Sequence, residues 1–233
     1  TEAGRALKPR AELVLQTLTD TRRALGKLSG QVRGRLSMAT SHHIGLHRLP
    51  PVLRRFTKAY PGVALDIDFL DSEVAYDQVL RGDVELAIIT LAPQVEPPLV
   101  AATIWNDPLD FVIAPEHPLA GRERVSLRQL ADYPAVFPGA NTFTHRVVSG
   151  LFEQHGIRPD IGMSTNYLET IKMMVSIGLA WSVLPRTMLD NQVRALPIPG
   201  VALQRRLGVI WHSGRTLSNA AEALIELLRH DAD

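Results

Sequence analysis

The sequence contains no cysteine in its 233 residues. This absence excludes a disulfide framework, a thiol nucleophile and thiolate metal ligands. No apolar run approaches the ~20 residues that a membrane span needs, and no charged segment followed by an apolar one opens the chain as an export leader. We therefore expect a cytoplasmic protein with no membrane partner.

Excess charge is also lacking, because 25 Lys and Arg nearly balance 24 Asp and Glu for a formal net charge of +1. Proteins that bind nucleic acid over their whole surface usually carry a marked basic excess. Apolar residues make up 45% of the chain, which is ordinary for a globular protein. The first residues, Thr1 to Gly4, read as the interior of a longer protein.

Catalytic signatures are missing as well. No GxSxG elbow, phosphate-binding loop or dinucleotide-binding glycine motif occurs, and the pair Asp66 and Asp68 alternates on a strand. The one cluster that resembles a metal site is His42, His43 and His47, but no carboxylate has the spacing that completes a HExxH motif. We expect no enzyme, no cofactor and no metal, with the histidines in a polar pocket or at the surface.

A heptad pattern opens the chain. Its apolar seam has spacings that alternate between four and three residues: Leu7, Ala11, Val14, Leu18, Thr21, Leu25, Leu28 and Val32. This pattern predicts a coiled-coil helix over residues 1–34, with Leu7, Ala11, Val14, Leu18, Leu25 and Leu28 as the dimerisation seam. The alternative is a long helix packed on its own domain.

Strand and helix patterns then alternate. Strands are predicted at 36–40, 63–70 and 84–90, with one helix whose apolar face includes Leu46 and Phe56 and a second helix at 72–80. This β-α-β-α-β order predicts a mainly parallel sheet with right-handed crossovers, and such sheets bind ligands beyond the carboxyl ends of their strands.

The second half repeats this pattern. Strands are predicted at 99–104, 109–114, 135–137, 161–165, 179–184 and 207–212, and helices at 126–133, 145–155, 167–177 and 218–229. Residues 138–144 read as a polar turn. Two α/β lobes joined by two crossover segments would leave a ligand-binding cleft between them.

Hydroxyl and amide side chains gather at the predicted strand ends: Thr40, Ser41, Thr90, Thr142, Thr144, Thr165 and Asn166. Such groups, with the free N–H groups at helix N-termini, bind small anions without a buried countercharge. Each alone is more often a cap or turn residue. Their shared place at the predicted cleft favours a binding site.

Several segments together resemble the LysR-type transcriptional regulators. Thr1 to Arg5 resembles the LTEAG that opens the family's linker helix, and Leu80 to Ile88 resembles its L..G.LDLAI signature. Further similar segments are Leu49–Phe56 with Tyr60–Val63, the HPLA at His117–Ala120, and Val175–Ala180 through Leu184–Pro185. These motifs are weak singly but specific in this order, and they cover nearly the whole chain.

The resemblance implies an α/β fold of two Rossmann-like lobes of periplasmic-binding-protein type II after a linker helix. The lobes would comprise residues 35–104 plus 203–233 and residues 105–202. An effector would contact Thr40, Ser41, His43, Thr90, Thr142, Phe143 and Thr144. His42, His43 and Ile44 depart from members that bind small inorganic anions, which argues against a sulfate-like ligand and leaves room for a carboxylate that His43 could meet if protonated.

The resemblance also implies partners. The protein would form a homodimer or homotetramer and would bind promoter DNA through an N-terminal winged helix-turn-helix that these residues do not include. The alternative is a solute-binding protein that delivers a small anion for transport. The heptad helix argues against this alternative, because a transport receptor is normally a monomer.

Overall fold

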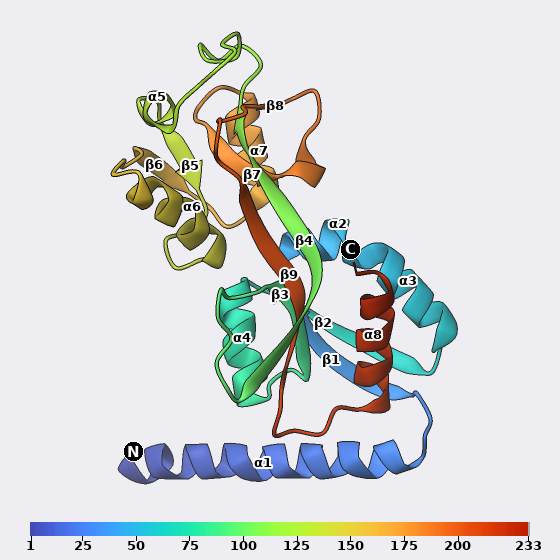
Figure 1. The fold of residues 1–233 in the computed structure, drawn as a ribbon. Coiled ribbons are helices and arrows are strands. Elements are labelled where there is room, and N and C mark those ends of the chain that lie inside the picture. The colour runs from blue at the N-terminus through green and yellow to red at the C-terminus, as the bar shows by residue number, and fades with distance from the viewer. Residues whose placement is uncertain (233) are drawn as a thin grey trace.

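The computed structural model describes residues 1–232 and shows a long N-terminal helix followed by two lobes (Figure 1). The helices are α1 (Glu2–Leu28), α2 (His42–His47), α3 (Leu49–Ala59), α4 (Ser72–Arg81), α5 (Leu127–Ala131), α6 (Phe143–Gln154), α7 (Leu168–Ser176), the 3₁₀ helix η1 (Arg186–Met188) and α8 (Asn219–His230). The strands are β1 (Gly34–Thr40), β2 (Val63–Phe69), β3 (Leu86–Thr90), β4 (Leu99–Ile113), β5 (Ala135–Phe137), β6 (Ile161–Ser164), β7 (Ser182–Pro185), β8 (Arg194–Ala195) and β9 (Leu203–His212). Within residues 1–232, no helix has the length and apolar character to cross a membrane.

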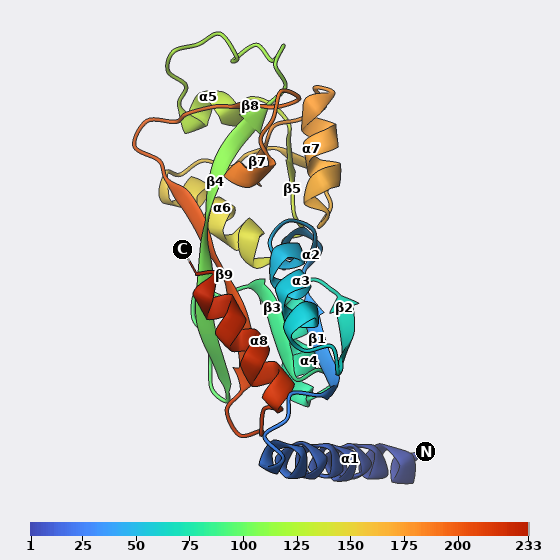
Figure 2. The same ribbon diagram turned by 90° about the vertical axis from the view of Figure 1, so that its right-hand side faces the viewer.

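The main sheet has the strand order β2-β1-β3-β9-β4-β7, and β8 pairs with β4. Pairing is parallel among β1, β2 and β3, as predicted, but β9 is antiparallel to both β3 and β4. In the first lobe, α3 and α8 pack on one face of the sheet and α4 packs on the other (Figure 2). The sheet is therefore mixed, because the chain leaves this lobe along β4 and returns along β9.

β4 is one continuous strand of 15 residues, so the prediction of two strands separated by a turn at Asn106–Pro108 is wrong. Its ladder with β9 runs from Leu99 opposite His212 to Leu109 opposite Leu203, with one irregularity near Thr103. These long-range backbone hydrogen bonds override the local turn signal of the proline. Figure 1 shows β4 and β9 running side by side through both lobes, so they are the segments that connect them.

The junction after β1 contains two short helices where the sequence predicts one. The helix is interrupted at Arg48, because Pro50 and Pro51 occupy the first turn of α3, where a missing N–H costs little. Leu46 consequently falls on α2 and is 57% exposed, so its predicted place on the buried face is wrong. Gly45 allows α2 to lie against β2, because a Cβ there would clash with the ring of Phe69.

The second lobe is built around the buried Trp181, which packs against Phe111, Phe137 and Phe152. Its helix α6 begins at Phe143, and the Thr142 side chain caps it by accepting a hydrogen bond from the backbone N–H of His145. The predicted polar turn is therefore too long. Phe143 and Thr144 belong to the first helical turn, which brings the free N–H groups of α6 toward the first lobe.

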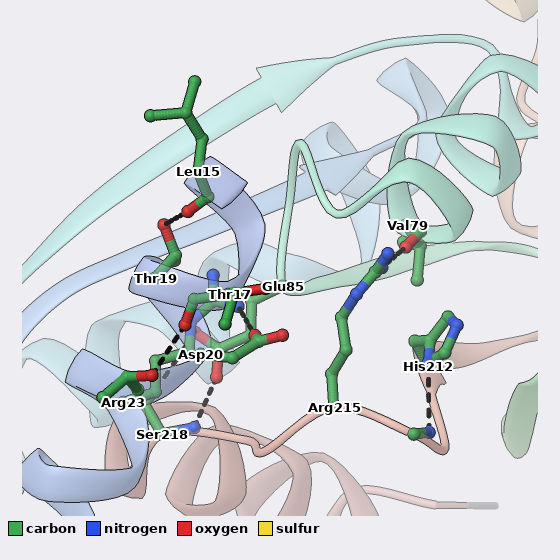
Figure 3. A network of polar contacts seen from close by, with 12 residues as sticks. Leu15, Thr17, Thr19, Asp20, Arg23, Val79, Glu85, His212, Arg215 and Ser218 are labelled. Carbon is green, nitrogen blue, oxygen red and sulfur yellow. Dashed lines mark hydrogen bonds and ion pairs between the residues drawn. The ribbon is translucent and has the colours of Figure 1, made fainter. Parts of the chain in front are cut away.

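Helix α1 extends along the outside of the first lobe, and none of its residues is buried. Its 27 residues make a rod about 40 Å long. Figure 3 shows its main anchor, where Nε of Arg23 lies 3.4 Å from Oε2 of the buried Glu85. Glu85 also accepts hydrogen bonds from the backbone N–H and hydroxyl of Ser218. The predicted seam leucines remain exposed, so their role in dimerisation stays a prediction.

Candidate functional site

A narrow cavity of about 50 Å³ lies between the two lobes. It is lined by residues from the N-termini of α2, α4 and α6, from the ends of β3 and β5, from the segment before α7, and from β9. The lining residues are Ser41, His42, His43, Asp71, Ser72, Glu73, Thr90, Pro138, Thr142, Thr144, Asn166, Leu168 and Arg205. The cavity therefore lies at the carboxyl edge of the parallel strands, where the sequence predicts a ligand.

Five of the seven predicted contact residues line this cavity, namely Ser41, His43, Thr90, Thr142 and Thr144. The other two lie elsewhere. The buried hydroxyl of Thr40 donates a hydrogen bond to the carbonyl of Ile88, at 2.8 Å, and so joins β1 to β3. The ring of Phe143 packs edge-on against Tyr76, with 5.3 Å between ring centroids.

Arg205 is the residue that sequence reasoning missed. Its side chain is almost fully buried, and Nε donates to Oδ2 of the fully buried Asp107 at 2.7 Å. One terminal nitrogen donates to the hydroxyl of Thr144 at 3.0 Å, whereas Nη2 has no hydrogen-bond partner among residues 1–232. Arg48 also lies 3.5 Å from Asp107, so two guanidinium groups face one carboxylate. This corner of the cleft has an excess positive charge and a free donor.

Asp107 and Arg205 meet because they are directly opposite each other in the β4–β9 ladder. Opposite charges at such a position are a recognisable cross-strand signal. The sequence pattern did not reveal it, because Asp107 falls in the predicted turn and β9 begins four residues before the predicted strand. The correct strand register was the information that was missing.

His43 is 5% exposed, and neither ring nitrogen has a hydrogen-bond partner among the described residues. Burial, followed by the positive charge of Arg205 and by His47, lowers the pKa of His43 to about 3. The imidazole is therefore neutral at physiological pH. The condition under which His43 could meet a carboxylate, a protonated ring, is not met in this closed arrangement, where Arg205 carries the positive charge.

Two carboxylates of the first lobe bind donors of the second lobe. Oε1 of Glu73 accepts a hydrogen bond from the backbone N–H of Phe143 at 2.6 Å, and Oδ2 of Asp71 accepts one from the side-chain amide of Asn166 at 2.6 Å. The N-terminus of α6 is the position at which the sequence predicts an anion. A carboxylate of the protein itself occupies that position here, and it holds the lobes together.

A third bridge between the lobes lies at one side of the cavity. Nε2 of His47 lies 3.0 Å from Oε1 of Glu169, which belongs to the first turn of α7. His43, His47 and Glu169 each place one ligand atom within 4.8 Å of the others, a grouping suited to a metal ion. No carboxylate lies at a suitable spacing from the histidines in the sequence. Glu169 of the second lobe supplies the carboxylate instead.

Comparisons with known proteins agree with this geometry. The family described as LysR substrate binding domain matches residues 29–233. The transcriptional regulator SsuR of Burkholderia cenocepacia is 28% identical over 192 residues, which are 82% of this chain and 62% of that protein. The chain therefore spans about three fifths of the length of this relative.

Two solved structures share the fold. The effector binding domain of QuiR in complex with shikimate superposes with a TM-score of 0.78 and 20% identity, over 86% of this chain and 97% of that one. The regulatory domain of CcmR from Synechocystis PCC6803, in complex with 2-PG, superposes with a TM-score of 0.77 and 22% identity, over 86% of this chain and 98% of that one. These neighbours confirm the predicted fold of two α/β lobes.

Proposed function

The chain belongs to the LysR substrate-binding domain family, and we propose that it senses a small organic anion between its two lobes. The observation that carries this proposal is Nη2 of the buried Arg205, which has no hydrogen-bond partner among residues 1–232 and belongs to a side chain that lines the cleft. A buried charged donor without a partner is costly, and a carboxylate or phosphate would satisfy it with a charge-assisted hydrogen bond.

Other residues that line the cavity constrain the rest of the ligand. Asp71 and Glu73 offer carboxylate acceptors, while Ser41 and Thr142 offer hydroxyls. An effector that carries both an anionic group and hydroxyl donors would complement Arg205 and these residues together. Shikimate, the ligand named for the QuiR structure, is a hydroxylated carboxylic acid, and this likeness supports the same chemical class here.

The cavity of about 50 Å³ holds little more than one or two water molecules. Known sites for small organic ligands are roughly 300–1,000 Å³. The effector must therefore bind to an arrangement in which the lobes have separated, and the contacts of Glu73 and Asp71 must break. A ligand that favours one lobe arrangement shifts the equilibrium by its differential affinity.

In the whole protein, we propose that residues 1–34 dimerise through the seam on α1, with a dimer or a tetramer as the functional unit. Residues 35–104 with 203–233 form one lobe and residues 105–202 the other. A winged helix-turn-helix outside these residues would read promoter DNA in the cytoplasm, and the protein would regulate transcription without catalysis. A transport receptor of the same fold has no use for the exposed leucine row of α1.

The test is thermal unfolding with a panel of hydroxylated carboxylates, aromatic acids and phosphorylated acids, because a ligand that binds only the folded state raises the Tm. Each acid is paired with its neutral amide. We expect a hit whose amide is inactive and whose effect is lost in Arg205→Gln but kept in Arg206→Gln, an exposed neighbour on the same strand. An amide as effective as its acid would contradict an anion site.

A further inference from the structure

The grouping of His43, His47 and Glu169 has a chemical character that the anion site does not explain. The histidines are four residues apart on α2, so they lie on one helical face, and their ring centroids are 4.9 Å apart. Glu169 comes from α7 in the other lobe, 122 residues later, and lies 3.0 Å from Nε2 of His47. The three side chains therefore meet only when the lobes are closed.

His43 is the second and independent indication. It is buried, both of its ring nitrogens lack a partner among residues 1–232, and it is the neutral ring that coordinates metals. A buried imidazole with no hydrogen bond is costly for a fold to keep. A ligand that accepts the lone pair of one ring nitrogen would remove the part of this cost that belongs to that nitrogen, without bringing a further donor into the cleft.

We propose that His43, His47 and Glu169 bind one divalent transition-metal ion of the zinc class, which bridges the two lobes. Two imidazoles and one carboxylate match the ligand set of zinc sites, whereas Mg²⁺ and Ca²⁺ prefer oxygen ligands alone. Tetrahedral bonds of about 2.0–2.1 Å separate ligand atoms by about 3.4 Å. The observed separations, 3.0 Å at one edge and at most 4.8 Å overall, reach this value with small rotations of the side chains.

The charged groups around the three side chains determine how favourable the site is for a cation. Arg205 and Arg48 face His43 and disfavour a cation, whereas Asp107 between them and Glu169 at the site favour one. Lys172 lies one turn further along α7, but it is paired with Asp190 at 2.6 Å. Because two ligands belong to the first lobe and one to the second, the ion would stabilise the closed arrangement of the lobes.

The test is titration of the untagged, chelator-treated chain with Zn²⁺ in competition with a chromophoric chelator. We expect one ion per chain, with affinity reduced at least tenfold in His47→Gln and in Glu169→Gln. His155→Gln, which removes an exposed histidine from the end of α6, should bind as the parent does. Co²⁺ should give the intense visible absorption of a tetrahedral site in the parent and lose it in both ligand variants.

Circular dichroism first establishes that each variant is folded, and Zn²⁺ should then raise the Tm of the parent but not that of Glu169→Gln. Glu169→Gln is the decisive variant, because its carboxylate is the only proposed ligand from the second lobe and is partly exposed. Unchanged affinity in this variant, or less than one ion per chain in the parent, would overturn the bridging site. No organic effector is used, so failure of the metal site leaves the anion proposal standing.

Discussion

Glu73 gives the sharpest prediction, because its carboxylate holds the lobes together at the N-terminus of α6. Oε1 accepts the backbone N–H of Phe143 at 2.6 Å, across the cleft. We predict that Glu73→Ala increases the population of open lobes in the absence of effector. Glu73→Gln, which keeps a neutral acceptor, should open the lobes less.

The magnitude follows from the type of bond. A hydrogen bond to a charged group contributes about 1.5–3 kcal/mol. Glu73 is only partly buried, so solvent screening reduces this to about 1–2 kcal/mol. A change of that size shifts the ratio of closed to open molecules by roughly 5–30-fold. Glu73 is also in the first turn of α4, where loss of its charge costs the fold about 0.3–1 kcal/mol.

Single-molecule energy transfer measures this opening directly, because the chain has no cysteine of its own. Dyes attached through Asp77→Cys on α4 and Gln154→Cys on α6 report the separation of the two helices whose N-termini meet. We expect a new population of lower transfer efficiency in Glu73→Ala and none in Glu226→Ala, which removes an exposed glutamate from α8. Identical distributions for Glu73→Ala and the parent would refute the view that Glu73 holds the lobes closed.

Three further predictions concern charge. Arg205→Gln leaves the fully buried Asp107 without its closest partner, so urea unfolding should show a loss of about 3–5 kcal/mol. Arg206→Gln should cost less, because it removes only exposed hydrogen bonds to the carbonyls of Ala92 and Pro93. Folding lowers the pKa of His43 from 6.5 to about 3. Between pH 6.5 and 3 the unfolded chain therefore binds a proton at His43 that the folded chain does not bind. The free energy of unfolding should decrease as the pH falls below about 6.5. The decrease is about 2 kcal/mol at pH 5. Urea unfolding at pH 5 and 7.5 measures it, and His43→Gln should show no such decrease. Arg23→Met should loosen α1 from the first lobe and speed amide hydrogen exchange in α1, whereas Arg22→Met should not.

Local patterns predicted most elements of the fold, because helix caps and apolar periodicity are encoded in adjacent residues. Ser126 and Ser218, at the predicted starts of two helices, cap α5 and α8, and the αL glycine at Gly82 ends α4. Apart from local errors at Leu46 and at the start of α6, the main failure concerns long-range pairing. The continuity of β4 through Pro108 depends on a partner strand about 100 residues away, and the turn signal at this position competes with that pairing.

The candidate site also contains residues that a local sequence pattern reveals and residues that it does not. Ser41, Thr90 and Thr142 could be found because they follow strands or precede helices, and such positions converge at one edge of an α/β sheet. Arg205 and Glu169 had no local signal. Arg205 lies within a strand, and Glu169 lies in an ordinary first helical turn. Arg205 acquires its role from the register of β4 and β9, and Glu169 acquires one where α7 meets α2, and the spacing of residues along the chain encodes neither contact.

The contacts of α1 determine how lobe movement reaches the linker helix. The buried Glu85 joins Arg23 to Ser218, and Lys27 lies beside Glu222 on α8, so α1 is attached to the first lobe alone by these ion pairs. Strand β3 runs from Leu86, next to Glu85, to Thr90 at the cavity, and all five of its residues are buried. A close-packed strand transmits displacement without absorbing it. The first lobe and α1 should therefore move as one body. Effector binding should change the position of the second lobe relative to α1.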